Sequence, residues 1–195
     1  MKTALVVVNV QNDFCPDGAL AAAEGDQVVV PTNQLIGHFR RRGALVIYTR
    51  DWHPPNHCSF QTKGGPWPVH CVQFTPGAQF HRDLDVPDDA IIMNKAWPPE
   101  KEDVSGKSTS ELFIKLTQSG IQRIVLAGLA TDYGIKTTAH DARTAGFEVI
   151  VITDAIRALN VRPGDGQRAL DDLRARGAAL LTSAEFLNAF QPLEK

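Results

Sequence analysis

The amino-acid sequence of this 195-residue chain predicts a single doubly wound α/β domain, with a six-stranded, mainly parallel sheet flanked by helices. Two observations support this fold class. Short apolar runs alternate with helical segments along the chain. The runs also lack polar alternation, which is typical of parallel strands that helices cover on both faces. A chain of this length most economically forms one domain, residues 1–195, and we find no linker or internal repeat that marks a second.

The predicted strands are short apolar runs, most of them rich in β-branched residues. The first run is far too short to span a bilayer, and no small-residue cleavage site follows it. We therefore interpret it as a buried strand rather than a signal peptide. In chain order the predicted strands are Ala4–Val8, Ala44–Tyr48, Ala90–Met93, Ile124–Leu126, Val149–Ile152 and, with the weakest pattern, Ala178–Leu181.

Helices are predicted between these strands, where the residue pattern changes to helical spacing. A glycine that directly follows a helix and precedes a strand is typical of a helix C-terminal cap. Gly43, Gly120, Gly146 and Gly177 occupy such positions. The predicted helices are Pro31–Arg42, Ser110–Gln118, Asp132–Ala145, Asp165–Arg176 and Ser183–Phe190.

The segment from Asp51 to Asp89 interrupts the alternation, since it is dense in Pro, Gly, His and Trp. A long irregular segment inside a compact domain is usually functional. This one begins at the carboxyl end of a predicted strand, where open parallel sheets place their ligands. We therefore expect a binding or catalytic site there.

Composition excludes some classes of partner. The net charge is −2 and no basic stripe stands out, so neither nucleic acid nor a membrane surface is expected to bind. The three cysteines are an odd number without CxxC spacing, which fits a reduced, cytoplasmic setting.

Histidines and a carboxylate gather in the long segment. Asp51 and His53 lie two residues apart, so an extended backbone places both side chains on one side. His57 and His70 follow in proline-rich chain, where a turn must bring them near. One carboxylate with two or three imidazoles suits zinc, iron or manganese. The alternative is that these are surface histidines in a polar loop. The remaining three histidines, His38, His81 and His140, are interpreted as solvated or packing residues.

Five strings of the sequence resemble nicotinamidases of the isochorismatase-like (cysteine hydrolase) superfamily, in family order and spacing. They are 9-NVQNDFCPDGAL-20, 51-DWHPPNH-57, 67-WPVHCVQFTPGAQFH-81, Lys95 after a strand, and 127-AGLATDYGIKTTAHDA-142. The resemblance implies a Rossmann-like, three-layer α/β fold and the hydrolysis of nicotinamide to nicotinate and ammonia. It also implies a divalent metal, zinc before iron or manganese, that holds the pyridine nitrogen, and it makes a homo-oligomer plausible.

The same resemblance assigns roles to single residues. Asp51, His53 and His70 match the metal ligands, and His57 matches a fourth ligand that only some members use. Lys95 matches the catalytic lysine. The Leu129–Ala130 bond matches a bond that is cis in the family, next to the backbone amides of an oxyanion hole. The substrate-binding positions are Phe14, Leu20, Trp67, Leu129, Ala130 and Tyr133.

Two positions depart from the family pattern. Asn9 replaces the aspartate that ends the first strand, and Gly134 replaces the nucleophilic cysteine. Glycine has no side chain to attack with, and the asparagine amide cannot accept the proton. Isochorismatases also carry glycine at the nucleophile position, but they need the aspartate as proton donor and lack the metal cluster. Cys15 lies near the same strand end, and we do not expect it to replace the missing thiol.

These features predict a metal-containing pseudoenzyme, in which the cysteine mechanism is absent. We expect it to bind nicotinamide, nicotinate or a related pyridine carboxamide or carboxylate with little or no turnover. Two alternatives remain open. One is an active hydrolase of an amide or ester that uses metal-bound water. The other is a non-enzymatic scaffold in which the long segment is vestigial.

Overall fold

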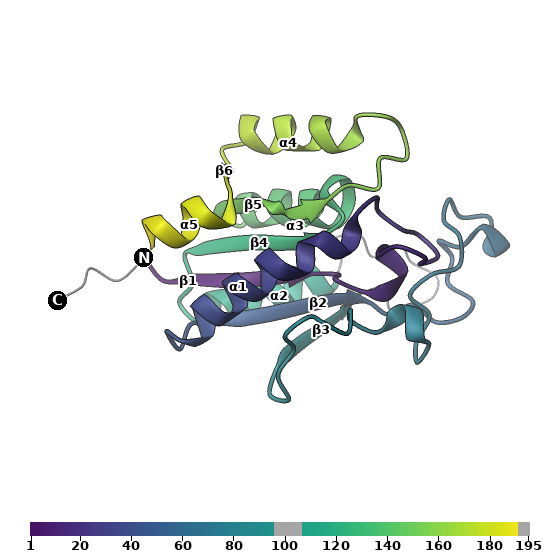
Figure 1. Ribbon diagram of the computed structural model, residues 1–195, viewed down its shortest axis with the longest axis horizontal. Helices are drawn as coiled ribbons and strands as arrows, with labels where there is room; N and C mark the ends of the chain where they lie inside the picture. Colours follow the sequence, from purple (N-terminus) through teal and green to yellow (C-terminus); the bar gives the residue numbers. More distant parts are fainter. Residues whose placement is uncertain (96–106, 191–195) are drawn as a thin grey trace.

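The computed structural model describes residues 1–95 and 107–190, which form an α/β fold with one central sheet (Figure 1). The sheet has six strands in the order β3-β2-β1-β4-β5-β6. All five strand pairs are parallel, so the predicted fold class is confirmed and the sheet is entirely parallel. The strands are β1 Thr3–Val8, β2 Val46–Asp51, β3 Ile91–Lys95, β4 Arg123–Leu129, β5 Glu148–Arg157 and β6 Ala179–Leu181.

Helices cover both faces of the sheet because each strand carries apolar side chains on both sides. Leu5 and Val7 of β1 belong to the core that α1 and α5 cover. Ala4, Val6 and Val8 belong to the opposite core, which α2, α3 and α4 cover. The fold therefore has three layers. The helices are α1 Val29–Arg40, α2 Lys107–Gln118, α3 Lys136–Thr144, α4 Asp165–Ala175 and α5 Ser183–Ala189.

The predicted helix caps are confirmed by the backbone. Gly43, Gly120, Gly146 and Gly177 have φ angles of 61°, 69°, 89° and 83°. A residue with a side chain rarely adopts this left-handed conformation, which explains glycine at the ends of these helices.

The strand order changes direction at β1, which pairs with β2 on one side and β4 on the other. In such a sheet the connections leave in opposite directions, and a crevice opens at the carboxyl ends of the strands. Asp51 and Lys95 face each other in the register of β2 and β3. Asn9 directly follows β1, so three predicted site residues reach the same edge of the sheet.

Most elements differ from the sequence prediction by a few residues at their ends, and the two main differences are in β5 and α3. β5 continues to Arg157 instead of ending at Ile152. The helix predicted from Asp132 begins as a π-helical turn, Thr131–Ile135, and becomes α-helical only at Lys136. A π-turn is wider than an α-turn and is often found at functional sites.

The long segment 51–89 contains only short 3₁₀ turns, at Gln61–Lys63 and Pro76–Ala78, as its composition indicates. Its first part lies beyond the carboxyl ends of β1 and β2, and its last residues run back to the start of β3 (Figure 1). Within the described ranges, no helix is long and apolar enough to cross a lipid bilayer.

Candidate active site and metal centre

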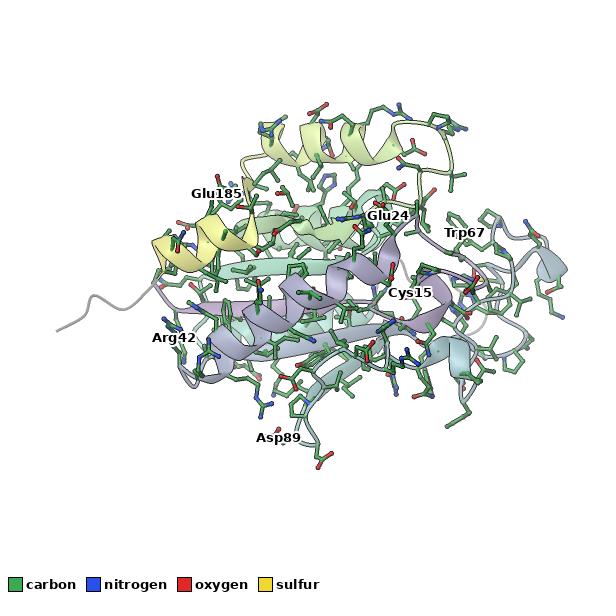
Figure 2. The ribbon with its side chains drawn as sticks, viewed as in Figure 1. Cys15, Glu24, Arg42, Trp67, Asp89 and Glu185 are labelled. Carbon is green, nitrogen blue, oxygen red and sulfur yellow. The ribbon has the colours of Figure 1, made fainter. Side chains whose placement is uncertain are left out.

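A cavity of about 270 Å³ lies at the carboxyl edge of the sheet, between the long segment and the π-turn. Trp67, which is labelled in Figure 2, is at this end of the molecule. The residues that line the cavity come from six separate parts of the chain. They are Asn9, Phe14, Leu20, Asp51, His53, His57, Ser59, Trp67, His70, Lys95, Ala130, Tyr133, Gly134 and Leu159.

Asp51, His53 and His70 converge in this cavity as predicted. Each offers a ligand atom, and these atoms lie within 4.8 Å of one another. The backbone holds them in place, because the His53 amide donates to the carbonyl of Cys71 at 2.9 Å. His70 Nδ1 lies 2.8 Å from the Pro68 carbonyl, which leaves Nε2 as the ligand atom when Nδ1 carries the proton.

The charge states of the cluster suit a divalent cation. Burial lowers the pKa of His53 to about 4, against the opposing pull of Asp51, so this imidazole is neutral at pH 7. Burial would raise the pKa of Asp51, but Lys95, the two histidines and the Asn9 hydrogen bond together hold it below its usual value. His53 Nδ1 is buried without a hydrogen-bond partner. A carboxylate and two imidazoles match the ligands that zinc prefers.

His57 lies in the same cavity but outside this triad. Its ring centroid is 4.6 Å from that of His53, and it is fully buried. Its Nδ1 pairs with the hydroxyl of Ser59 at 2.7 Å. A role for His57 as a fourth ligand therefore stays a prediction.

The side chain of Asn9 is oriented by its two partners. Its Oδ1 accepts from the Thr49 hydroxyl at 3.1 Å, and its Nδ2 donates to Asp51 Oδ1 at 3.0 Å. A carboxylate can only accept, so the amide nitrogen must face Asp51. Lys95 Nζ lies 3.6 Å from the same Asp51 oxygen. A lysine and an amide group thus converge on one metal-ligand candidate.

Gly134 faces the cavity from the π-turn, next to Asn9. A Cβ atom at this position would lie 3.7 Å from Asn9 Nδ2. It would also lie 3.0 Å from the Leu129 carbonyl oxygen and 3.1 Å from Val8 Cγ1, so a larger residue requires a small shift of these neighbours. The Leu129–Ala130 peptide bond is cis, as expected from the resemblance.

Aromatic and aliphatic side chains form the remaining wall. Trp67 and Tyr133 meet edge to face with ring centroids 4.9 Å apart, and Phe14 contacts His70 in the same way at 5.8 Å. Of the two predicted positions at the cis bond, Ala130 lines the cavity, whereas Leu129 is fully buried in the core and does not.

Two lining residues were not predicted from the sequence. Ser59 lines the cavity, where its hydroxyl contacts His57. Leu159 is held at the cavity because the Asp132 carboxylate accepts from the backbone amides of Leu159 and Asn160, at 3.0 and 2.8 Å. The sequence carries no local signal for Leu159, because the strand before it was predicted to end at Ile152 and extends to Arg157 in the structure.

Comparison with known proteins matches this architecture to one family. The Isochorismatase domain matches residues 3–185. The chain belongs to this family. The nicotinamidase of Escherichia coli (strain K12) is 38% identical over 204 residues, with 94% of this chain and 96% of that protein covered.

Solved structures of the isochorismatase family agree. Pyrazinamidase of Pyrococcus horikoshii, in complex with zinc, is 43% identical with a TM-score of 0.86, covering 93% of this chain and 99% of that chain. PnC1 from L. infantum, in complex with nicotinate, is 31% identical with a TM-score of 0.86 and covers 94% of each chain. The resemblance to nicotinamidases seen in the sequence is therefore confirmed.

Proposed function

We propose that this chain is a nicotinamidase-type pseudoenzyme. Asp51, His53 and His70 hold a divalent metal, zinc before iron or manganese, beside a pocket for a pyridine carboxamide or carboxylate. The family reaction, hydrolysis of nicotinamide, has little or no turnover here. The observation that carries the proposal is one cavity that contains the complete ligand triad together with Asn9 and Gly134.

The metal assignment is supported by the orphaned Nδ1 of His53 and by the neutral imidazole that its lowered pKa provides. The volume of about 270 Å³ suits a single-ring ligand. A divalent ion bound to the triad would supply a coordination position for the ring nitrogen of that ligand. Phe14, Trp67 and Tyr133 supply aromatic surface for the ring.

The loss of the thiol mechanism follows from the residues around the reacting position. A cysteine nucleophile needs a thiolate and a base within hydrogen-bond reach. Gly134 provides no sulfur. A base at position 9 would have to accept a proton, whereas the Asn9 side chain donates a hydrogen bond to Asp51.

Cys15 and Cys71 do not replace the missing group. Cys15 does not line the cavity, and burial, with Asp26, raises the pKa of its thiol to about 11. Burial also raises the pKa of Cys71 well above its usual value. Thiolate formation near neutral pH is therefore unfavourable at both of these positions.

Isothermal titration of the zinc-loaded chain with nicotinamide and with nicotinate tests the proposal. We expect saturable heat for at least one ligand, and no binding by the His53→Ala variant. An assay for ammonia release from nicotinamide should stay flat with zinc, iron or manganese. Absence of binding by both ligands at millimolar concentration would contradict the proposal, and chelator-sensitive ammonia release would favour hydrolysis by metal-bound water.

A further inference from the structure

We propose that this cavity selects a pyridine carboxylate over the corresponding carboxamide, an inference that rests on the proposed function. The two departures from the family pattern do more than remove a nucleophile and a base. They leave a part of the cavity that borders Asn9 and Lys95, whose side-chain nitrogens both donate hydrogen bonds. This is a site for an anionic group.

The charges around the cavity support an anionic ligand. Among the lining residues that the structure describes, Asp51 is the only carboxylate and Lys95 is the only lysine or arginine. Their formal charges cancel, and a divalent ion on the triad would make the cavity positive. An aspartate in place of Asn9 would instead put a second carboxylate about 3 Å from Asp51, where Asn9 Nδ2 now lies at 3.0 Å.

The hydrogen-bond donors of Asn9 and Lys95 point to the same preference. Asn9 Nδ2 carries two N–H groups and uses one of them on Asp51 Oδ1. This nitrogen lies 3.7 Å from the point where a Cβ of residue 134 would be, so it borders the space that glycine leaves. Lys95 Nζ, with three N–H groups, approaches the same Asp51 oxygen at 3.6 Å.

A carboxylate and a carboxamide fill this space differently. Both oxygens of a carboxylate can accept from Asn9 and Lys95. A carboxamide has one oxygen, so its NH₂ group would leave one of these two donors without an acceptor. Hydrogen bonds to a charged acceptor are about twice as strong as neutral ones, so we expect nicotinate to bind roughly tenfold more tightly than nicotinamide.

Titration calorimetry on the zinc-loaded full chain, with both ligands at one pH, measures this ratio. The Asn9→Asp variant should lower the affinity for nicotinate more than that for nicotinamide, because it adds a carboxylate and removes a donor. Lys95→Gln should also lower the ratio of nicotinate affinity to nicotinamide affinity, because it removes the lysine charge. Gln122→Glu adds the same charge at an exposed position before β4, at the opposite edge of the sheet, and should leave the ratio unchanged.

The outcomes separate this inference from the proposed function. Equal affinities, or tighter binding of nicotinamide, would overturn the carboxylate preference and leave the proposed function standing. A folded, zinc-loaded Asn9→Asp protein with the wild-type ratio would overturn the role given to Asn9. Absence of binding by either ligand would overturn the proposed function itself.

Discussion

Asn9 and Gly134, the two positions that depart from the family pattern, line the same cavity as the candidate metal ligands. Asn9 fits between Thr49 and Asp51 with ordinary hydrogen-bond lengths of 3.1 and 3.0 Å. Gly134 leaves open a position that is tight for any side chain. Beside these two residues, the ligand atoms of Asp51, His53 and His70 still lie within 4.8 Å of one another.

Restoring both residues should restore the family reaction. In the Asn9→Asp/Gly134→Cys double variant, the thiol gains a base, and the retained Lys95 and triad complete the site. We expect ammonia release from nicotinamide on the order of a thousandfold or more above the parent chain, since catalytic residues that act as a unit fail together. A coupled ammonia assay on zinc-loaded protein measures it.

The two single variants are the controls for this restoration. Each lacks one member of the pair, so each should stay close to the parent rate. Gly134→Cys also requires the Leu129 carbonyl and Val8 to move by a few tenths of an ångström, which circular dichroism and unfolding can check. A folded, zinc-loaded double variant without activity would show that the cavity no longer fits the family reaction.

At the scale of elements, α5 depends on a capping box at its first residues. The Thr182 hydroxyl accepts from the Glu185 amide at 3.2 Å, and the Glu185 carboxylate accepts from the Thr182 amide at 2.7 Å. Thr182→Ala should lower the free energy of unfolding by about 1 kcal/mol, measured by urea denaturation. Thr182→Ser keeps the hydroxyl and should lose much less, and an equal loss in both variants would refute a capping role.

The sequence predicts the presence and order of the six strands because each contains a short apolar run. It places the end of β5 too early because Thr153 and Asp154 break the run. In the structure, the Asp154 carboxylate accepts from the Ser183 amide at 2.7 Å, a long-range contact that no local pattern contains. Leu159 was missed for a similar reason, since Asp132, 27 residues away, fixes its position. Asp51 and His53 were predictable from their spacing of two residues at a strand end, whereas the resemblance to nicotinamidases added His70 to the triad.

Across the whole molecule, the candidate metal site joins the sheet to the long irregular segment. Asp51 ends β2, whereas His70 lies 19 residues further along the chain, beyond the turns at 61–63. Backbone bonds from His53 to Cys71 and from Gln73 to His53, at 2.9 and 2.8 Å, already hold the two parts together. A bound ion would add a second connection at the same place, and its removal would leave the His53 Nδ1 atom buried without a partner.

Removal of the metal should therefore loosen the long segment before it affects the sheet. Zinc at a thousand times its dissociation constant adds about 4 kcal/mol to the free energy of unfolding when it binds only the folded state. We expect a chelator to lower the unfolding midpoint and to speed amide exchange within residues 52–74, while exchange in β1 and β4 changes little. His53→Ala should abolish the response to zinc, and His81→Ala, outside the cavity, should retain it. Identical unfolding curves with and without zinc would show that the triad does not connect these two parts of the molecule.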